Sequence, residues 1–172
     1  QYLYLSTPET TPFTVTILKN DGTLPVSVTI SNAQPARWSI GSSGNTPVMV
    51  LEGDLHKALK TKGLTLIGPK KFYVNFRFHS SSEYQAADLT CKGRSALGTA
   101  FRIGHIFQSS SSNSQRSNFV GIIATEDSTV VTLSDFDPNT DFEINGTTTP
   151  VTGPQTVTLQ ANESVVFSQY VS

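Results

Sequence analysis

The feature that most constrains the fold is an alternation of apolar and hydroxyl-bearing side chains in short runs near both ends of the chain. Residues 13–17 read Phe-Thr-Val-Thr-Ile and residues 26–30 read Val-Ser-Val-Thr-Ile, and similar runs return at 129–133 and 156–159. Because successive side chains of a strand point to opposite faces, this period of two predicts β-strands with one buried and one hydrated face. The intervening Asn20-Asp21-Gly22 predicts a tight hairpin turn.

Further strands are predicted at 64–67, 72–78 and 165–167. The strand at 72–78 has a clear two-sided character. Its apolar face would carry Phe72, Val74, Phe76 and Phe78, and its opposite face Tyr73, Asn75, Arg77 and His79. The segment is therefore expected to bury one face and to present aromatic and polar groups on the other.

Only residues 54–63 suggest a helix. Asp54 is a suitable N-cap, Leu55 and Leu59 follow at helical spacing with Ala58, and Gly63 is a suitable stop. A helix of roughly ten residues is too short to be stable alone, so it is expected to depend on docking.

The two ends of the chain resemble each other. Val15-Thr16-Ile17 parallels Val131-Thr132-Leu133, with Leu5 and Ile123 in corresponding upstream positions. Further on, residues 27–30 parallel 156–159, and each run is followed eight residues later by an aromatic residue, Trp38 or Phe167. We interpret this as a duplicated β unit; chance similarity between strands rich in Thr and Val is the alternative.

Together these signals predict an all-β fold, a β-sandwich of Greek-key or jelly-roll type with a duplicated strand unit and one short helix. A propeller-like β repeat is the alternative architecture. We expect a single β domain over residues 1–172, made of two related units at about 1–107 and 118–172. A serine-rich loop at 108–117 would join them and be mobile.

Charge is sparse and unevenly distributed. Charged residues make up 15% of the chain and the net charge is −1, so nucleic-acid binding through bulk charge is not expected. Residues 57–102 carry nine basic and two acidic side chains, whereas residues 103–172 carry one basic and seven acidic ones. These are solvated faces or a polar surface for an anionic partner. No run approaches 18 apolar residues, so no insertion into a membrane is expected.

The sequence offers little for catalysis. It contains neither a Gly-x-Ser-x-Gly elbow nor a glycine-rich phosphate loop, and His56, His79 and His105 lack metal-ligand spacing. The lone Cys91 cannot form an internal disulfide and is expected to be buried as a small apolar residue. The chain is therefore expected not to be an enzyme.

The sharpest candidate site is an acidic run at 135–143. Oxygen-bearing side chains recur at every second position, and the candidate metal ligands are Asp135, Asp137, Asn139, Asp141 and Glu143. Calcium takes about six to eight oxygen ligands, which a curled loop of this pattern can supply. The spacing is not that of an EF-hand, so a hydrated polar turn without metal is the alternative. Calcium is the one possible cofactor.

Sugar recognition is a further possibility, because Trp38, Tyr73 and Tyr84 could stack on pyranose rings. A single Trp in a strand is more often a core residue. This possibility keeps a calcium-dependent carbohydrate-binding module as the alternative function.

A family resemblance is carried by residues 119–133, Phe-Val-Gly-Ile-Ile-Ala-Thr-Glu-Asp-Ser-Thr-Val-Val-Thr-Leu. This run resembles the Ala-Thr-Glu-Asp-x-Thr-x-Val-Thr signature of the IgGFc-binding protein N-terminal domain family. Residues 1–15 and 89–102 are similar to its bacterial members, long secreted surface proteins of gliding Bacteroidetes that often carry type IX secretion sorting domains. The resemblance implies no site residues that can be mapped onto this chain.

What the resemblance implies is a non-catalytic cell-surface adhesion or interaction module of a large secreted protein, located outside the cell. The expected partners are an extracellular protein or glycan and neighbouring domains of the same longer chain. The start at Gln1, with neither Met nor a signal sequence, is expected of an excised piece.

Overall fold

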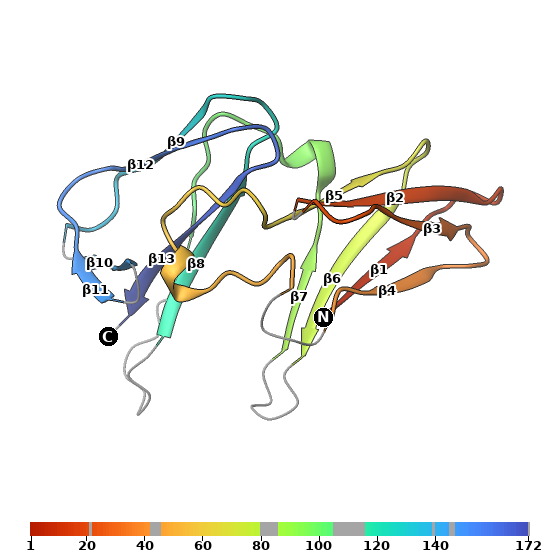
Figure 1. Ribbon diagram of the computed structural model, residues 1–172, viewed down its shortest axis with the longest axis horizontal. Coiled ribbons are helices and arrows are strands. Elements are labelled where there is room, and N and C mark those ends of the chain that lie inside the picture. The colour runs from red at the N-terminus through yellow and green to blue at the C-terminus, as the bar shows by residue number, and fades with distance from the viewer. Residues whose placement is uncertain are drawn as a thin grey trace. The chain divides into compact units, whose positions relative to one another are not determined.

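The computed structural model describes residues 1–20, 22–41, 46–79, 86–104, 116–138, 140–144 and 147–171. These ranges are nearly all β, with several antiparallel sheets and no α-helix, as the sequence predicts for an all-β sandwich protein. The chain forms two compact units (Figure 1). Unit 1 consists of Gln1–Met49 and Leu64–Ala100, and unit 2 consists of Val50–Gly63 and Phe101–Ser172.

Unit 1 is a sandwich of a four-stranded sheet, in the order β4-β1-β6-β7, and a three-stranded sheet, in the order β3-β2-β5. All of its strand pairs are antiparallel. Its strands are β1 (Tyr2–Ser6), β2 (Phe13–Lys19), β3 (Val26–Ile30), β4 (Ala36–Ser39), β5 (Leu64–Ile67), β6 (Tyr73–His79) and β7 (Ala86–Thr90), and the 3-10 turn η2 (Gly93–Ala96) follows them.

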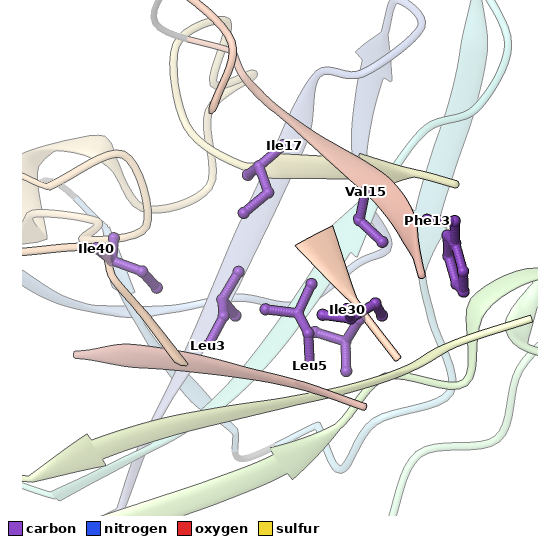
Figure 2. Packing of buried hydrophobic residues seen from close by; sticks show 8 residues of the cluster. Leu3, Leu5, Phe13, Val15, Ile17, Ile30 and Ile40 are labelled. Carbon is purple, nitrogen blue, oxygen red and sulfur yellow. The ribbon is translucent and has the colours of Figure 1, made fainter. Parts of the chain in front are cut away.

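The two sheets of unit 1 enclose an aliphatic core (Figure 2). Leu3 and Leu5 from β1 meet Val15 and Ile17 from β2, and the last two side chains have no solvent-accessible surface. The intervening Thr and Tyr residues point away from this core, which confirms the predicted alternation. Trp38 packs against the same cluster and is therefore a core residue, not an exposed platform for a sugar.

Unit 2 has a four-stranded sheet, in the order β11-β10-β13-β8, and a two-stranded ribbon of β12 and β9. Its strands are β8 (Arg116–Ile123), β9 (Thr129–Leu133), β10 (Asp141–Ile144), β11 (Thr147–Pro150), β12 (Gln155–Leu159) and β13 (Ser164–Val171), with the 3-10 turn η1 (Glu52–Asp54) earlier in the chain. Val131 and Leu159 from the ribbon pack with Val165 and Phe167 from β13.

The two units repeat one pairing pattern. In unit 1, β1 pairs with β4 and β2 with β3; in unit 2, β8 pairs with β13 and β9 with β12. The register of the β2–β3 pair matches that of the β9–β12 pair, because Val15 faces Val28 and Val131 faces Val157. This shared pairing is what a duplicated strand unit would produce, and the duplication itself stays a prediction. The two residues placed in corresponding upstream positions differ in burial, since Leu5 is buried whereas Ile123 is 45% exposed.

The predicted helix at 54–63 is wrong. After η1 the chain follows the edge of β13: the amide of His56 donates to the Val166 carbonyl at 2.9 Å, and Leu59 exchanges two main-chain hydrogen bonds with Ser164. His56 also has φ +61°, which no right-handed helix accommodates. Leu55 and Leu59 are buried as their spacing suggested, but the open strand edge supplies the backbone partners that a helix would have supplied.

Two further predictions concern Cys91 and the serine-rich segment 108–117. Cys91 is exposed, not buried, and it directly follows β7, the edge strand of its four-stranded sheet. Most of the serine-rich segment 108–117 lies outside the described residues, so its predicted role as a mobile joining loop stays a prediction. Its last two residues, Arg116 and Ser117, already belong to β8.

Candidate binding face

The outer face of the four-stranded sheet of unit 1 collects tyrosine, arginine and hydrogen-bonding side chains. We call it the tyrosine–arginine face, and it consists of Tyr2, Tyr4, Arg37, Tyr73, Asn75, Arg77, Asp88 and Thr90. Strand alternation places them there, because their neighbours Leu3, Leu5 and Val74 point into the core. The sheet thus presents polar and aromatic groups on the side opposite its core.

The three tyrosines of this face are large and open to solvent. Tyr2 is 38% exposed, Tyr4 37% and Tyr73 63%. Tyrosine combines a flat apolar ring with a hydroxyl, so an exposed cluster offers contact area at a small entropic cost. Exposed single apolar residues are common, but three tyrosines on one sheet face are a feature of binding surfaces.

Both arginines stack diagonally on tyrosine rings. The Arg37 guanidinium lies 4.9 Å from the centroid of Tyr2, and the Arg77 guanidinium lies 5.4 Å from that of Tyr4. In the strand register, Arg37 is opposite Tyr4 and Arg77 is opposite Tyr2, so each arginine reaches the next ring along β1. These cation–π contacts restrict the side chains before any partner arrives.

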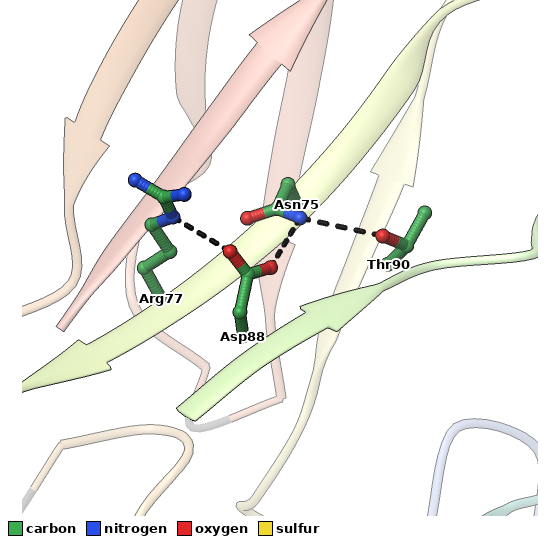
Figure 3. A network of polar contacts seen from close by, with 4 residues as sticks. All are labelled: Asn75, Arg77, Asp88 and Thr90. Carbon is green, nitrogen blue, oxygen red and sulfur yellow. Dashed lines mark hydrogen bonds and ion pairs between the residues drawn. The ribbon is translucent and has the colours of Figure 1, made fainter. Parts of the chain in front are cut away.

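A polar network continues the face from β6 to β7 (Figure 3). Arg77 Nε donates to Asp88 Oδ2 at 2.7 Å, and the amide nitrogen of Asn75 donates to Asp88 Oδ1 and to Thr90 Oγ1. The hydrogen bond from Arg77, and then that from Asn75, hold the pKa of Asp88 below its ordinary value. Asp88 is therefore a carboxylate at neutral pH, and Arg77 stays a cation.

The network leaves one acceptor without a partner. Asn75 Oδ1 is buried and accepts no hydrogen bond from any described residue. Its direction is fixed, because the amide nitrogen must face Asp88 and Thr90; in Figure 3 the oxygen points away from Thr90. An unpaired buried acceptor costs about 1–3 kcal/mol, a cost that a ligand donor would remove.

A hollow of about 270 Å³ crosses this face near Asn75. The side chains of Tyr4 and Tyr73 border it, with Pro35 and Ala36 on one side and Thr90 on the other. Leu5 and Val74 also line it, and because their side chains point into the core they contribute main chain to its floor. The hollow is thus framed by two aromatic rings, and Asn75, whose buried Oδ1 has no partner among the described residues, is one of its lining residues.

The predicted calcium ligands lie in and before β10 of unit 2. Asp135 and Asp137 are exposed in the connection after β9, Asp141 and Glu143 occupy alternate positions of β10, and Asn139 lies outside the described residues. Glu143 accepts a hydrogen bond from the Ser168 hydroxyl at 3.2 Å. In the part of the chain that is described, no three His, Cys, Asp or Glu side chains gather in a metal-binding arrangement. The calcium site stays a prediction.

Unit 2 also contains a semi-buried histidine. His56 packs edge-on against Phe142 and Phe167, with ring centroids 5.3 and 5.2 Å away. Its Nε2 accepts a hydrogen bond from the Ser168 amide at 3.0 Å, which makes Nδ1 the protonated nitrogen of the neutral ring. Burial lowers the pKa of His56, and hydrogen bonding to Ser168 and the charge of Glu143 oppose that shift.

Sequence reasoning found one side of this face and missed the rest. It assigned Tyr73, Asn75 and Arg77 to the exposed side of their strand, and this is confirmed. It did not associate Tyr2, Tyr4 or Arg37 with them, although the alternation of Tyr2-Leu3-Tyr4-Leu5 is a readable signal. Strand order could not be read from the sequence. Tyr84, proposed earlier as a sugar platform, lies outside the described residues.

Comparison with known proteins identifies a family for the second half of the chain. The model of the family described as IgGFc binding protein matches residues 86–172, about half of the chain. No curated protein matches, and neither does any solved structure. Within the described ranges, no helix is long and apolar enough to cross a membrane. The matched residues include Asp88 and Thr90 of the tyrosine–arginine face and the signature at 119–133. This chain belongs to the IgGFc-binding protein family.

Proposed function

We propose that the chain is a non-catalytic adhesion module of a larger cell-surface protein, and that its tyrosine–arginine face engages an extracellular protein ligand. The family is one of extracellular binding modules and not a known enzyme family. The observation that carries the proposal is the pre-stacked pairing of Arg37 with Tyr2 and of Arg77 with Tyr4 on an exposed sheet. Tyrosine and arginine are the residues that most often dominate binding energy at protein interfaces.

The setting of the module is part of the same proposal. Secretion by the type IX system and a role at the surface of gliding Bacteroidetes follow from the resemblance of residues 1–15 and 89–102 to bacterial members. The family name refers to the Fc part of immunoglobulin G, and this ligand serves as a probe here, not as an assignment.

The test measures binding of the chain to immobilised immunoglobulin G Fc and to immobilised mucin. Replacing Tyr4 and Arg37 together by alanine should weaken binding to the recognised protein by at least about tenfold, since truncation of central tyrosine and arginine contacts costs about 2 kcal/mol or more. Thr14→Ala, on the hydrated face of the other sheet, is the matched control and should change binding less than about twofold. Undiminished binding by the Tyr4/Arg37 variant would place the ligand surface elsewhere.

A further inference from the structure

The hollow between Tyr4 and Tyr73 has the chemistry of a saccharide site. We propose that it binds one or two pyranose rings of a glycan carried by the extracellular ligand, without a metal ion. This inference rests on the proposed function and adds the class of ligand that this part of the face recognises. It also differs from the calcium-dependent sugar binding considered from the sequence, because none of the predicted calcium ligands belongs to this hollow.

The shape and the aromatic border support a sugar ring. Apolar C–H faces of a pyranose pack flat against aromatic rings, and Tyr4 and Tyr73 offer two such rings on adjacent strands. The hollow, at about 270 Å³, is slightly smaller than the roughly 300–1,000 Å³ of pockets that hold drug-sized ligands. A ring or two would fill it, whereas a long extended chain would not fit inside.

The polar groups at the hollow favour a ligand that donates hydrogen bonds. Asn75 Oδ1 is a buried acceptor that no described residue satisfies, and it belongs to a lining residue of the hollow. Sugar hydroxyls can donate to this oxygen and can accept a hydrogen bond from the Thr90 hydroxyl, which also belongs to the lining of the hollow.

The same acceptor argues against the main competitor for an aromatic hollow, a proline-rich peptide. Polyproline segments dock between aromatic rings, but proline has no amide hydrogen, and such ligands need donors for their carbonyl groups. A proline-rich segment would therefore leave the acceptor Asn75 Oδ1 unpaired, whereas a sugar hydroxyl can donate to it. The hydrogen-bonding complement therefore matches a hydroxylated ligand.

The structure offers a matched pair of variants for the test. Tyr2 and Tyr4 lie on the same strand and the same face and are 38% and 37% exposed, but only Tyr4 lines the hollow. The folded chain would be applied to an array of immobilised oligosaccharides, and its affinity for the best-bound oligosaccharide measured in calcium and in chelator. Tyr4→Ala and Tyr73→Ala should each weaken binding about tenfold or more, and Tyr2→Ala less than about threefold, with chelator having no effect.

A second measurement isolates Asn75. Deoxy analogues of the bound sugar, each lacking one hydroxyl, would be compared on the unchanged chain and on Asn75→Ala. Removal of one particular sugar hydroxyl should weaken binding to the unchanged chain but should not weaken binding to Asn75→Ala any further. This non-additivity is expected when the hydroxyl and Asn75 are in direct contact.

Three outcomes would overturn the inference. The chain could bind no oligosaccharide, Tyr2→Ala could weaken sugar binding as much as Tyr4→Ala, or a polyproline peptide could bind with the predicted pattern of variants in place of a sugar. The proposed function is judged separately. If binding to Fc or mucin survives enzymatic removal of their glycans but depends on Tyr4 and Arg37, the glycan inference fails and the adhesion face stands.

Discussion

Unit 1 and unit 2 begin with the same pairing of four strands and differ in where further strands are added. In unit 1, β6 and β7 extend the sheet beside the first strand, β1. In unit 2, β10 and β11 extend it beside the last strand of the pattern, β13, and leave β8 at an edge of the described sheet. The strand pairs that the units share thus have similar sequences, whereas the added strands create the surfaces that distinguish the units.

The consequence is visible in the side chains that each extension contributes. In unit 1, β6 and β7 bring Asn75, Arg77 and Asp88 next to the tyrosines of β1, which completes an open polar face. In unit 2, β10 brings Phe142 and Glu143 next to Ser168 and His56, which produces a closed aromatic cluster. The proposed ligand surface therefore belongs to unit 1, whereas the side chains of this cluster in unit 2 pack against one another.

The largest expected effect tests whether the units are independent. Phe167 is 1% exposed in the core of unit 2, so Phe167→Ala should reduce stability by about 3–5 kcal/mol. Trp38, the single tryptophan, packs against the core of unit 1, so its fluorescence reports that unit. In a urea titration of Phe167→Ala, part of the strand signal in circular dichroism should be lost at a lower urea concentration than in the unchanged chain. The midpoint of the Trp38 fluorescence transition should stay unchanged.

Leu5→Ala is the reciprocal control. Leu5 is 1% exposed in unit 1, so its truncation should lower the Trp38 midpoint by an amount that corresponds to about 2–5 kcal/mol. If both substitutions move both signals equally, the two units unfold as one cooperative body and the comparison drawn above does not extend to stability.

The calcium hypothesis gives the next largest effect and concerns unit 2 alone. The candidate calcium ligands are Asp135, Asp137, Asn139, Asp141 and Glu143. If they bind calcium in the folded state only, a calcium concentration one hundred times the Kd should raise the free energy of unfolding by about 2.7 kcal/mol. The unfolding midpoint of unit 2 should then rise in calcium, not in magnesium or chelator, and Asp137→Ala should abolish the rise. Identical midpoints in all three solutions would leave a hydrated acidic turn.

A smaller effect is expected from acidification of unit 2. Because the pKa of His56 is lowered in the folded state, the unfolded chain binds more protons, and stability must fall as the pH drops below about 6.5. Protonation would place a charge beside Phe142 and Phe167 and abolish the hydrogen bond that Nε2 accepts from the Ser168 amide. Glu143 opposes the effect by attracting the imidazolium.

The variant for this measurement is His56→Asn, because asparagine tolerates the positive φ of this position. Thermal midpoints of unit 2 between pH 7.5 and 5.5 should fall more steeply for the unchanged chain than for His56→Asn. Equal slopes would show that the pKa of His56 does not differ between the folded and the unfolded chain.

The accuracy of sequence-based prediction follows the range of the interactions involved. Strands such as 13–17 and 26–30 were predictable because alternation is a local signal, whereas the pairing of Val15 with Val28 came from the structure. The segment 54–63 was mispredicted because its helical spacing is local, whereas the main-chain partners at Ser164 and Val166 lie more than a hundred residues away. Tertiary contacts overrode the local preference.

The candidate site shows the same limit. The exposed side of 72–78 was readable from one strand, but the face exists because β1, β4, β6 and β7 are neighbours. That order places Tyr4 opposite Asn75 and Arg77 opposite Asp88, pairs separated by up to 71 positions in the chain. A hydrophobic pattern specifies which side of a strand is wet and not which strands lie beside it.

The smallest predicted effect concerns the strand pairs that the units share, β2–β3 and β9–β12. Thr14 and Thr29 approach at 3.4 Å between hydroxyl oxygens in unit 1, and Thr132 and Thr156 do the same in unit 2. Both are directly opposed pairs on hydrated strand faces, so each double-mutant cycle to alanine should give a coupling of about 0.2–1 kcal/mol. If the repeated strand pair is energetically as well as geometrically equivalent, the two coupling energies should agree within about 0.5 kcal/mol. Coupling in one unit and none in the other would mean that the neighbouring strands, and not the repeated strand pair, determine how strongly these threonines interact.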